Sequence, residues 1–397
     1  MAESRSAAAP PATFAYDLNL PRDRHLFEKG REKRILALDG GGVRGIISIA
    51  FLERIEELLT EDAGTNVRLC DYFDLIGGTS TGAIIGSALA LGMSVKDVKE
   101  LYFDLAPRIF VTSLWRLRYL RARFDAAALS RELDRIIGNR PLDTPDLLTG
   151  YCVVAKRVDT GSPWILSNNP GAPYWNDNKD YRLANLIRAS TAAPTYFDPE
   201  SLPIAPGVKD GLFVDGGVSP YNNPSIALLM LSQLKAFNLR WPTGPDNLKI
   251  VSVGTGTHRK RMSSNRQWSI MNLFRVAIPA LRTVIDDAEL QSLMLLQWLG
   301  ECPDPQRWWI NSEILDMPDD KAPHGALFRF FRYDMRLEKD WFKEQAQLDV
   351  SDAVVNRMRE LDEVSMMPES YKIAREIAQQ QVRREDWTWA EKKQPAL

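Results

Sequence analysis

The chain has 397 residues, which is enough for one large domain with additions or for roughly two to three domains. Its hydrophobic content of 45% and charged content of 26% are ordinary for a globular enzyme with a sizeable core. The net charge of −2 gives no overall attraction to nucleic acid or to anionic membranes. We therefore expect no nucleic-acid polymer as a partner, and any membrane affinity must come from a local patch.

Cysteine usage and the absence of apolar runs favour a cytoplasmic protein. The cysteines Cys70, Cys152 and Cys302 are widely spaced and form no C-x-x-C pair, a pattern that favours free thiols in a reducing compartment. Residues 1–24 contain no apolar run of signal-peptide length. No segment reaches the ~20 apolar residues that are needed to span a bilayer.

The first elements form two repeats of strand, glycine-rich turn and helix. Residues 1–30 are expected to be a poorly ordered or loosely attached extension. The first predicted strand, 34–38, leads into the glycine loop D-G-G-G-V-R-G and an amphipathic helix through 46–59. The second strand, 73–76, leads into G-T-S-T-G and a helix rich in small residues over 83–91. Both glycine-rich turns therefore follow strand ends.

Further alternation predicts an α/β fold with a mostly parallel sheet that is covered on both faces. Later strands are expected at 151–155, 164–167, 212–214 and 249–253, with helices near 126–138, 182–190 and 224–237. From about residue 257 helical patterns dominate, at 270–299, 338–363 and 369–385. We take residues 261–397 as a helical C-terminal region that packs on, or regulates, the part before it.

The segment 78–82 fits G-x-S-x-G, the pattern that exposes a serine on a tight turn between a strand and a helix. Gly78 and Gly82 allow the close approach of backbone that such a turn needs, and Ser80 is the candidate nucleophile. A purely structural turn is the alternative. The second glycine loop on the preceding strand favours the nucleophile, because it brings a set of backbone donors to the same edge.

The first glycine loop permits two functions. Residues 40–45 also satisfy G-x-G-x-x-G between a strand and a helix, as in a dinucleotide-dependent oxidoreductase. That fingerprint expects an acidic residue at the end of the next strand, where this chain has Thr79 and Ser80. An oxyanion hole made by backbone N–H groups is the preferred reading, and the oxidoreductase stays as the alternative.

None of the three histidines is an evident general base for Ser80. His258 lies in a basic run, His324 in a polar turn and His25 in the N-terminal extension, so we expect all three at the surface. Asp215 ends an apolar strand and precedes a glycine turn. Asp39 has similar surroundings, and spacing alone does not choose between the two acids.

Five motifs together make the chain resemble the patatin-like phospholipases, which include bacterial members. They are ALDGGGVRG (37–45), GTSTG (78–82), ASTAAPTYF (189–197), VDGGVSPYNNP (214–224) and VSVGTGT (251–257). The resemblance covers roughly residues 31–260 and implies a three-layer α/β/α catalytic domain over that range. It also implies that Ser80 and Asp215 are the catalytic dyad, that Asp39 only begins the glycine loop, and that the oxyanion hole is formed by Gly40, Gly41 and Gly42 with Arg44 nearby.

The resemblance further implies hydrolysis of fatty-acyl esters of phospholipids or other lipids. No cofactor and no metal are expected, because the chain has no H-E-x-x-H and no acidic ligand loop. Some bacterial relatives are antiphage effectors that are switched on by cyclic nucleotides, so a cyclic-nucleotide activator is also implied. The lipid headgroup, the sn position and the oligomeric state stay open.

One stretch, residues 115–124, is a candidate for transient docking on a peripheral membrane surface. It carries four arginines and three aromatic residues without an acid, which suits contact with anionic headgroups. An amphipathic segment that packs on the core is an equal alternative. The docking residues would be Trp115, Arg116, Arg118, Tyr119, Arg121, Arg123 and Phe124.

Overall fold

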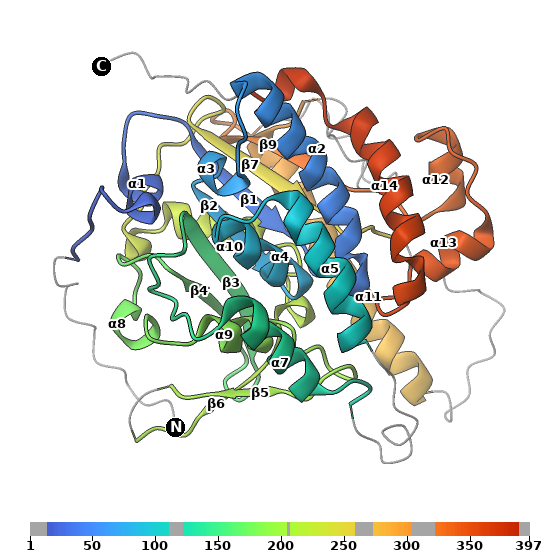
Figure 1. Cartoon of the computed structure of the whole chain (residues 1–397), viewed down its shortest axis with the longest axis horizontal. Helices are drawn as coiled ribbons and strands as arrows, with labels where there is room; N and C mark the ends of the chain where they lie inside the picture. Colours follow the sequence, from blue (N-terminus) through green and yellow to red (C-terminus); the bar gives the residue numbers. More distant parts are fainter. Residues whose placement is uncertain (1–13, 111–121, 205–206, 259–272, 304–321, 389–397) are drawn as a thin grey trace.

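The computed structural model describes residues 14–110, 122–204, 207–258, 273–303 and 322–388, with side chains left out for 273–285. One twisted sheet runs through this part of the chain, in the order β5-β6-β3-β2-β1-β7-β9-β8, with β4 paired to β3 (Figure 1). The parallel strands are β1 (Lys33–Leu38), β2 (Leu75–Thr79), β3 (Gly150–Arg157), β7 (Leu248–Val253), β8 (Gly300–Glu301) and β9 (Phe328–Tyr333). The antiparallel strands are β4 (Ser162–Ser167), β5 (Glu200–Leu202) and β6 (Gly211–Asp215).

The central strands are apolar on both faces, so each must be covered by helices on both sides. In β1, Leu36 and Leu38 belong to one core cluster, whereas Ile35 and Ala37 belong to another. Because successive side chains of a strand point to opposite faces, these two clusters lie on opposite sides of the sheet. The structure is therefore a three-layer α/β/α fold, as the sequence predicts.

The first layer contains α2 (Gly45–Ala63), α5 (Val95–Ile109) and α14 (Met367–Gln381), which pack side by side (Figure 1). The second layer contains α1 (Pro21–Phe27), α10 (Ser225–Gln233) and the end of α11 (Leu273–Leu299). A third cluster joins α4 (Thr81–Ala90), α7 (Ala126–Ile137) and α9 (Leu183–Ser190) to β3 and β6. The other described helices are α3 (Leu69–Tyr72), α8 (Trp175–Asn178), α12 (Lys339–Glu344) and α13 (Asp352–Met358).

Two sequence predictions need correction. Residues 1–13 lie outside the described residues, but 21–27 form α1, in which Leu26 is buried and its carbonyl accepts the indole N–H of Trp241 at 2.9 Å. This part of the extension is therefore firmly attached. The C-terminal region has the expected helices, but it also supplies β9, which pairs with β7 and extends the sheet of the predicted catalytic domain.

Within the described residues, no helix combines the length and the apolar character that crossing a membrane requires. The three cysteines are buried free thiols, which confirms their predicted state. The carboxyl ends of β1, β2 and β7 lie in register, with Leu38 beside both Gly78 and Val253. The turns that follow these strands therefore meet at one edge of the sheet.

Candidate active site

The turn after β2 holds Ser80 in an unusual backbone conformation, with φ 55° and ψ −123°. A residue other than glycine rarely adopts positive φ, so the turn stores strain of the order of 1–3 kcal/mol. The flanking glycines are required by space: a Cβ at Gly78 would lie 2.1 Å from the backbone of Gly82, and one at Gly82 would lie 2.2 Å from the Leu38 carbonyl oxygen. The geometry is that of a nucleophile elbow.

Ser80 donates its hydroxyl hydrogen bond to Asp215, with an Oγ–Oδ2 distance of 2.5 Å. The other oxygen of Asp215 accepts the Gly217 N–H at 2.7 Å, and the residue is 4% exposed. Burial raises the pKa of Asp215 to about 6, against the opposing effects of the Ser80 and Gly217 hydrogen bonds and of the Arg188 charge. The two predicted catalytic residues are therefore in contact, and the carboxyl is a stronger base than an exposed aspartate.

The strand that carries Asp215 to Ser80 runs in a direction that the sequence did not indicate. We expected it at the end of a strand in a mostly parallel sheet, but β6 runs antiparallel to β3 and pairs Asp215 with Ala155. The neighbouring residue Val154 pairs with Thr79 on the other side of β3. A Cβ at Gly216 would lie 2.4 Å from the Val154 carbonyl oxygen, so only glycine permits this close turn after the acid.

The glycine loop, residues 39–45, is held by hydrogen bonds to nearly all its backbone groups. Gly40 donates its N–H to Asn222 at 3.2 Å, and Gly40 and Gly42 accept from Thr255 and Thr81, each at 2.9 Å. The Arg44 N–H donates to Gly41, and the Val43 N–H donates to Leu361. Within this loop, no described residue accepts the N–H groups of Gly41 and Gly42. Two adjacent free donors at the start of a helix form an anion-binding nest.

The glycine loop lies directly against the nucleophile. A Cβ at Gly40 would lie 3.2 Å from the Ser80 Cβ and 2.5 Å from the Asn222 side-chain oxygen. A Cβ at Gly41 would lie 2.2 Å from the Thr255 hydroxyl oxygen. These approaches explain why the loop consists of glycine. Because the Gly40 N–H is already donated to Asn222, Gly41 and Gly42 are the better candidates for oxyanion donors.

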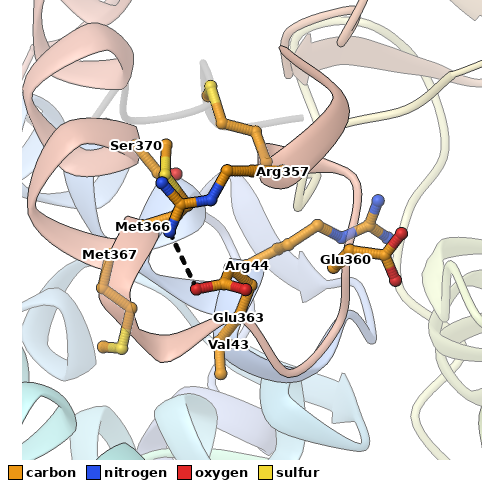
Figure 2. A pocket seen from close by; sticks show the side chains of 9 residues that line it. Val43, Arg44, Arg357, Glu360, Glu363, Met366, Met367 and Ser370 are labelled. Carbon is orange, nitrogen blue, oxygen red and sulfur yellow. Dashed lines mark hydrogen bonds and ion pairs between the residues drawn. The ribbon is translucent and has the colours of Figure 1, made fainter. Parts of the chain in front are cut away.

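Arg44 leaves the glycine loop toward the C-terminal helices. Its side chain lines a small hollow together with residues of α13, α14 and the loop between them (Figure 2). Within the described residues its Nε atom is buried without a hydrogen-bond partner. The predicted role of Arg44 near the oxyanion hole stays a prediction.

The identified hydrogen-bond partners of Ser80 and Asp215 among the described residues include no histidine. His324 is exposed. His25 is not at the surface as expected: its Nδ1 lies 2.9 Å from the buried carboxylate of Asp74, and its side chain is only 14% exposed. It is a structural residue at a different part of the sheet.

Behind the glycine loop lies a buried charged cluster that the sequence analysis missed. Arg332 of β9 is fully buried, and its Nη2 lies 2.7 Å from Asp39, 2.8 Å from Asp334 and 3.4 Å from Glu289. Glu289 also accepts the Asn222 amide at 3.2 Å. Asp39 therefore anchors the loop and does not touch Ser80, which supports Asp215 as the base. The cluster joins α11 and β9 to the site.

The proposed membrane stretch is only partly described, because residues 111–121 lie outside the described residues. This leaves Trp115, Arg116, Arg118, Tyr119 and Arg121 as untested predictions. Phe124 is 1% exposed and packs with Phe110, Tyr196 and Phe197, so this residue faces the core and is not available to a membrane. Arg123 pairs with Asp362 at 2.5 Å.

Comparisons with known proteins show which family the chain is similar to. The family profile of the patatin-like phospholipases matches residues 36–229. A cGAMP-activated phospholipase of Vibrio cholerae serotype O1 is 33% identical over 249 residues, 60% of this chain and 67% of the relative. A second cGAMP-activated phospholipase, from Escherichia coli, is 30% identical over 56% of this chain and 62% of the relative. The solved structure of human GIVD cytosolic phospholipase A2 aligns with 91% of this chain and 59% of its own, at 12% identity and a TM-score of 0.45.

Proposed function

The chain belongs to the patatin-like phospholipase family, and on this basis we propose that it is a lipid acyl hydrolase of the Ser–Asp type. The observation that carries the proposal is the 2.5 Å contact between Ser80 Oγ and the buried Asp215 carboxylate, beside the free N–H groups of Gly41 and Gly42. This arrangement contains a nucleophile, a base and an oxyanion site within one edge of the sheet. The dinucleotide-dependent alternative lacks support, because the end of β2 is the serine elbow.

The proposed reaction uses only groups of this chain and water. Asp215 accepts the proton of Ser80 while Oγ attacks the ester carbonyl carbon, and the N–H groups of Gly41 and Gly42 bind the developing oxyanion. The intermediate expels the alcohol oxygen, which takes the proton from Asp215. Water then attacks the acyl–serine ester while Asp215 accepts a proton from it, and the fatty acid leaves as Ser80 Oγ takes that proton back. Removal of one such oxyanion donor costs ~2.7–4 kcal/mol in known acyl-transfer sites.

The single carboxyl base favours esters over amides. An alkoxide leaving group needs less protonation than an amine, so a base with a pKa of about 6 is adequate to return its proton. We propose fatty-acyl esters of phospholipids as the substrate class, with other acyl-ester lipids included. Access to such substrates requires transient association of a cytoplasmic protein with a membrane surface. The activity would be of the phospholipase A or lysophospholipase type.

A cyclic-nucleotide activator is a second part of the proposal. It rests on two relatives that are named cGAMP-activated phospholipases, at 33% and 30% identity. The C-terminal region contacts the glycine loop through Leu361 and is the part in which such control would act. An activated lipid hydrolase in a bacterial cell would suit an antiphage effector, which damages membranes only after the signal arrives.

Fatty-acid release from a panel of phospholipid vesicles tests the proposal, with and without cyclic dinucleotides such as cGAMP. Wild-type protein should release fatty acid, and Ser80→Ala should release none while its thermal unfolding is unchanged. A fluorophosphonate should label wild-type protein at Ser80 and leave the variant unlabelled. Robust release by Ser80→Ala would refute the dyad, whereas equal release with and without cyclic nucleotide would refute the activator alone.

A further inference from the structure

The loop between α13 and α14, residues 359–363 and here called the rim loop, packs directly on the glycine loop. The Leu361 carbonyl accepts the Val43 N–H at 2.8 Å. A Cβ at Gly42 would lie 2.2 Å from the same carbonyl oxygen, so the two backbones are in close contact. The position of the rim loop therefore constrains the backbone of Gly42, whose N–H group is free, and of the next residue, Val43.

The next residue of the rim loop, Asp362, ties it to a different segment. Its carboxylate lies 2.5 Å from the guanidinium of Arg123, with side-chain exposures of 8% for the acid and 45% for the base. The Arg123 N–H donates to the Thr195 carbonyl at 3.0 Å, and the following N–H, of Phe124, donates to Tyr196 at 2.9 Å. The ion pair thus joins the rim loop to residues 189–197.

Residues 189–197 hold both members of the catalytic pair. The Ser190 hydroxyl oxygen accepts the Ser80 N–H at 2.8 Å and donates to the Val154 carbonyl at 2.6 Å. The Ala192 carbonyl accepts the Asp215 N–H at 3.0 Å. The contacts therefore form a closed path: from the glycine loop to the rim loop, across the ion pair to residues 189–197, and from there to Ser80 and Asp215.

From this path we propose that Arg123 and Asp362 are positioning residues, whose ion pair sets the distance between the oxyanion donors and the serine–aspartate pair. The inference rests on the proposed function and adds to it a link between the C-terminal region and the chemistry. An ion pair with one half-exposed partner contributes little to global stability. Its effect on rate is expected to be larger, because a misplacement of about 1 Å in a catalytic site costs about 100-fold.

The same loop provides a matched control. Arg357 and Glu363 form a second ion pair at 3.0 Å, with side-chain exposures of 55% and 35%, next to the hollow that Arg44 lines (Figure 2). This pair joins the end of α13 to the rim loop but makes no link to residues 189–197. Removing this second ion pair changes the charge of the same loop but leaves the contacts between the rim loop and residues 189–197 intact. A specific effect of Arg123 and Asp362 is thereby separated from a general effect on the loop.

The experiment measures kcat and KM on a soluble short-chain p-nitrophenyl ester, which removes any effect of vesicle binding. Arg123→Gln and Asp362→Asn should each lower kcat by about 10-fold with KM changed less than about twofold. The double variant should lose no more than either single variant, because both remove the same contact. Arg123→Lys should recover most of the rate. Arg357→Gln and Glu363→Gln should keep the wild-type kcat.

The outcomes are distinct. An unchanged kcat in both single variants, including one that accompanies a lower Tm, would overturn the inference. Losses that multiply in the double variant would also overturn it, because they would mean that the residues act independently. A wild-type protein that hydrolyses no ester under any condition would instead refute the proposed function on which the inference rests.

Discussion

Replacing Asp215 with asparagine should make the protein more stable while it abolishes ester hydrolysis. Asp215 is 4% exposed, and burial raises the pKa of its carboxyl group from 3.8 to about 6. A buried aspartate that is ionised at neutral pH therefore opposes folding. Asparagine keeps the shape and can still accept the Gly217 N–H, but it carries no charge. It cannot take the Ser80 proton, so the gain in stability comes with the loss of the base.

The magnitude follows from the shift in pKa. The folded state holds the proton more tightly than the unfolded chain, so this group destabilises the wild type progressively as pH rises from 3.8 through about 6. Above that range the cost is roughly 3 kcal/mol. For a chain of 397 residues such a change corresponds to about 3–4 °C in Tm. At pH 5 the folded carboxyl is largely protonated, and the gain from asparagine should fall to about half.

Calorimetry of wild type and Asp215→Asn at pH 7.5 and at pH 5 tests both the sign and the pH dependence. Asp287→Asn is the matched control, because Asp287 is an exposed carboxylate on α11, and it should change stability by less than about 0.5 kcal/mol. An asparagine variant that is no more stable than wild type at pH 7.5 would refute the argument. A gain of equal size at both pH values would mean that packing, and not ionisation, causes it.

Three further predictions concern the pH profile, the glycine loop and the membrane. On a soluble ester, kcat/KM should rise with pH through about 6 as the Asp215 carboxyl ionises. This rise should persist in a His258→Asn, His324→Asn double variant, and its loss there would indicate a histidine base. Gly41→Ala should lower kcat at least ~100-fold, because its Cβ would lie 2.2 Å from the Thr255 hydroxyl oxygen. Gly86→Ala is the control and should stay active, because the atom nearest to its Cβ, in the Ile76 side chain, would lie 3.3 Å away. Equal anionic-vesicle binding by wild type and a triple glutamine variant at low salt would exclude docking by Arg116, Arg118 and Arg121; we expect weaker binding by the variant.

Much of the fold could be predicted because its central strands are buried on both faces. The apolar runs predicted the bounds of β1 and β7 to within one residue and those of β2 to within three, and the helices after them show regular spacing. Strand β9 was missed for a physical reason: its sequence FRFFRY contains Arg329 and Arg332, and charged side chains do not resemble those of a core strand. Arg332 is tolerated there because Asp39, Asp334 and Glu289 surround it. Two of these acids are distant in sequence, so the sequence pattern contains no local sign of the pairing.

The candidate site, like the fold, was only partly predictable from the sequence. The serine elbow and the aspartate turn were found from local motifs, because tight turns require glycine at fixed spacing. The free donors of Gly41 and Gly42 could be distinguished from Gly40 only after the contact with Asn222 was known. The contacts of Leu361 and Asp362 join residues that lie more than two hundred positions apart, and neither residue type is unusual. Such long-range support has no signature in a single sequence.

The charged cluster leads to a last prediction, on the division into a domain of residues 31–260 and a C-terminal region. A fragment that ends at residue 260 lacks β9, so β7 becomes an exposed edge and the buried Asp39 loses its Arg332 partner. Breaking a buried ion pair alone costs ~3–5 kcal/mol, a large part of the stability of a typical domain. We therefore expect the fragment to be insoluble or unfolded by circular dichroism and inactive on a soluble ester. Arg332→Met in the full chain separates the two causes, because it keeps the strand but leaves the carboxylates without their cation, and it should lower the free energy of unfolding by about the same ~3–5 kcal/mol. A soluble, folded and active fragment would refute this reasoning and would make the catalytic domain independent of the C-terminal region.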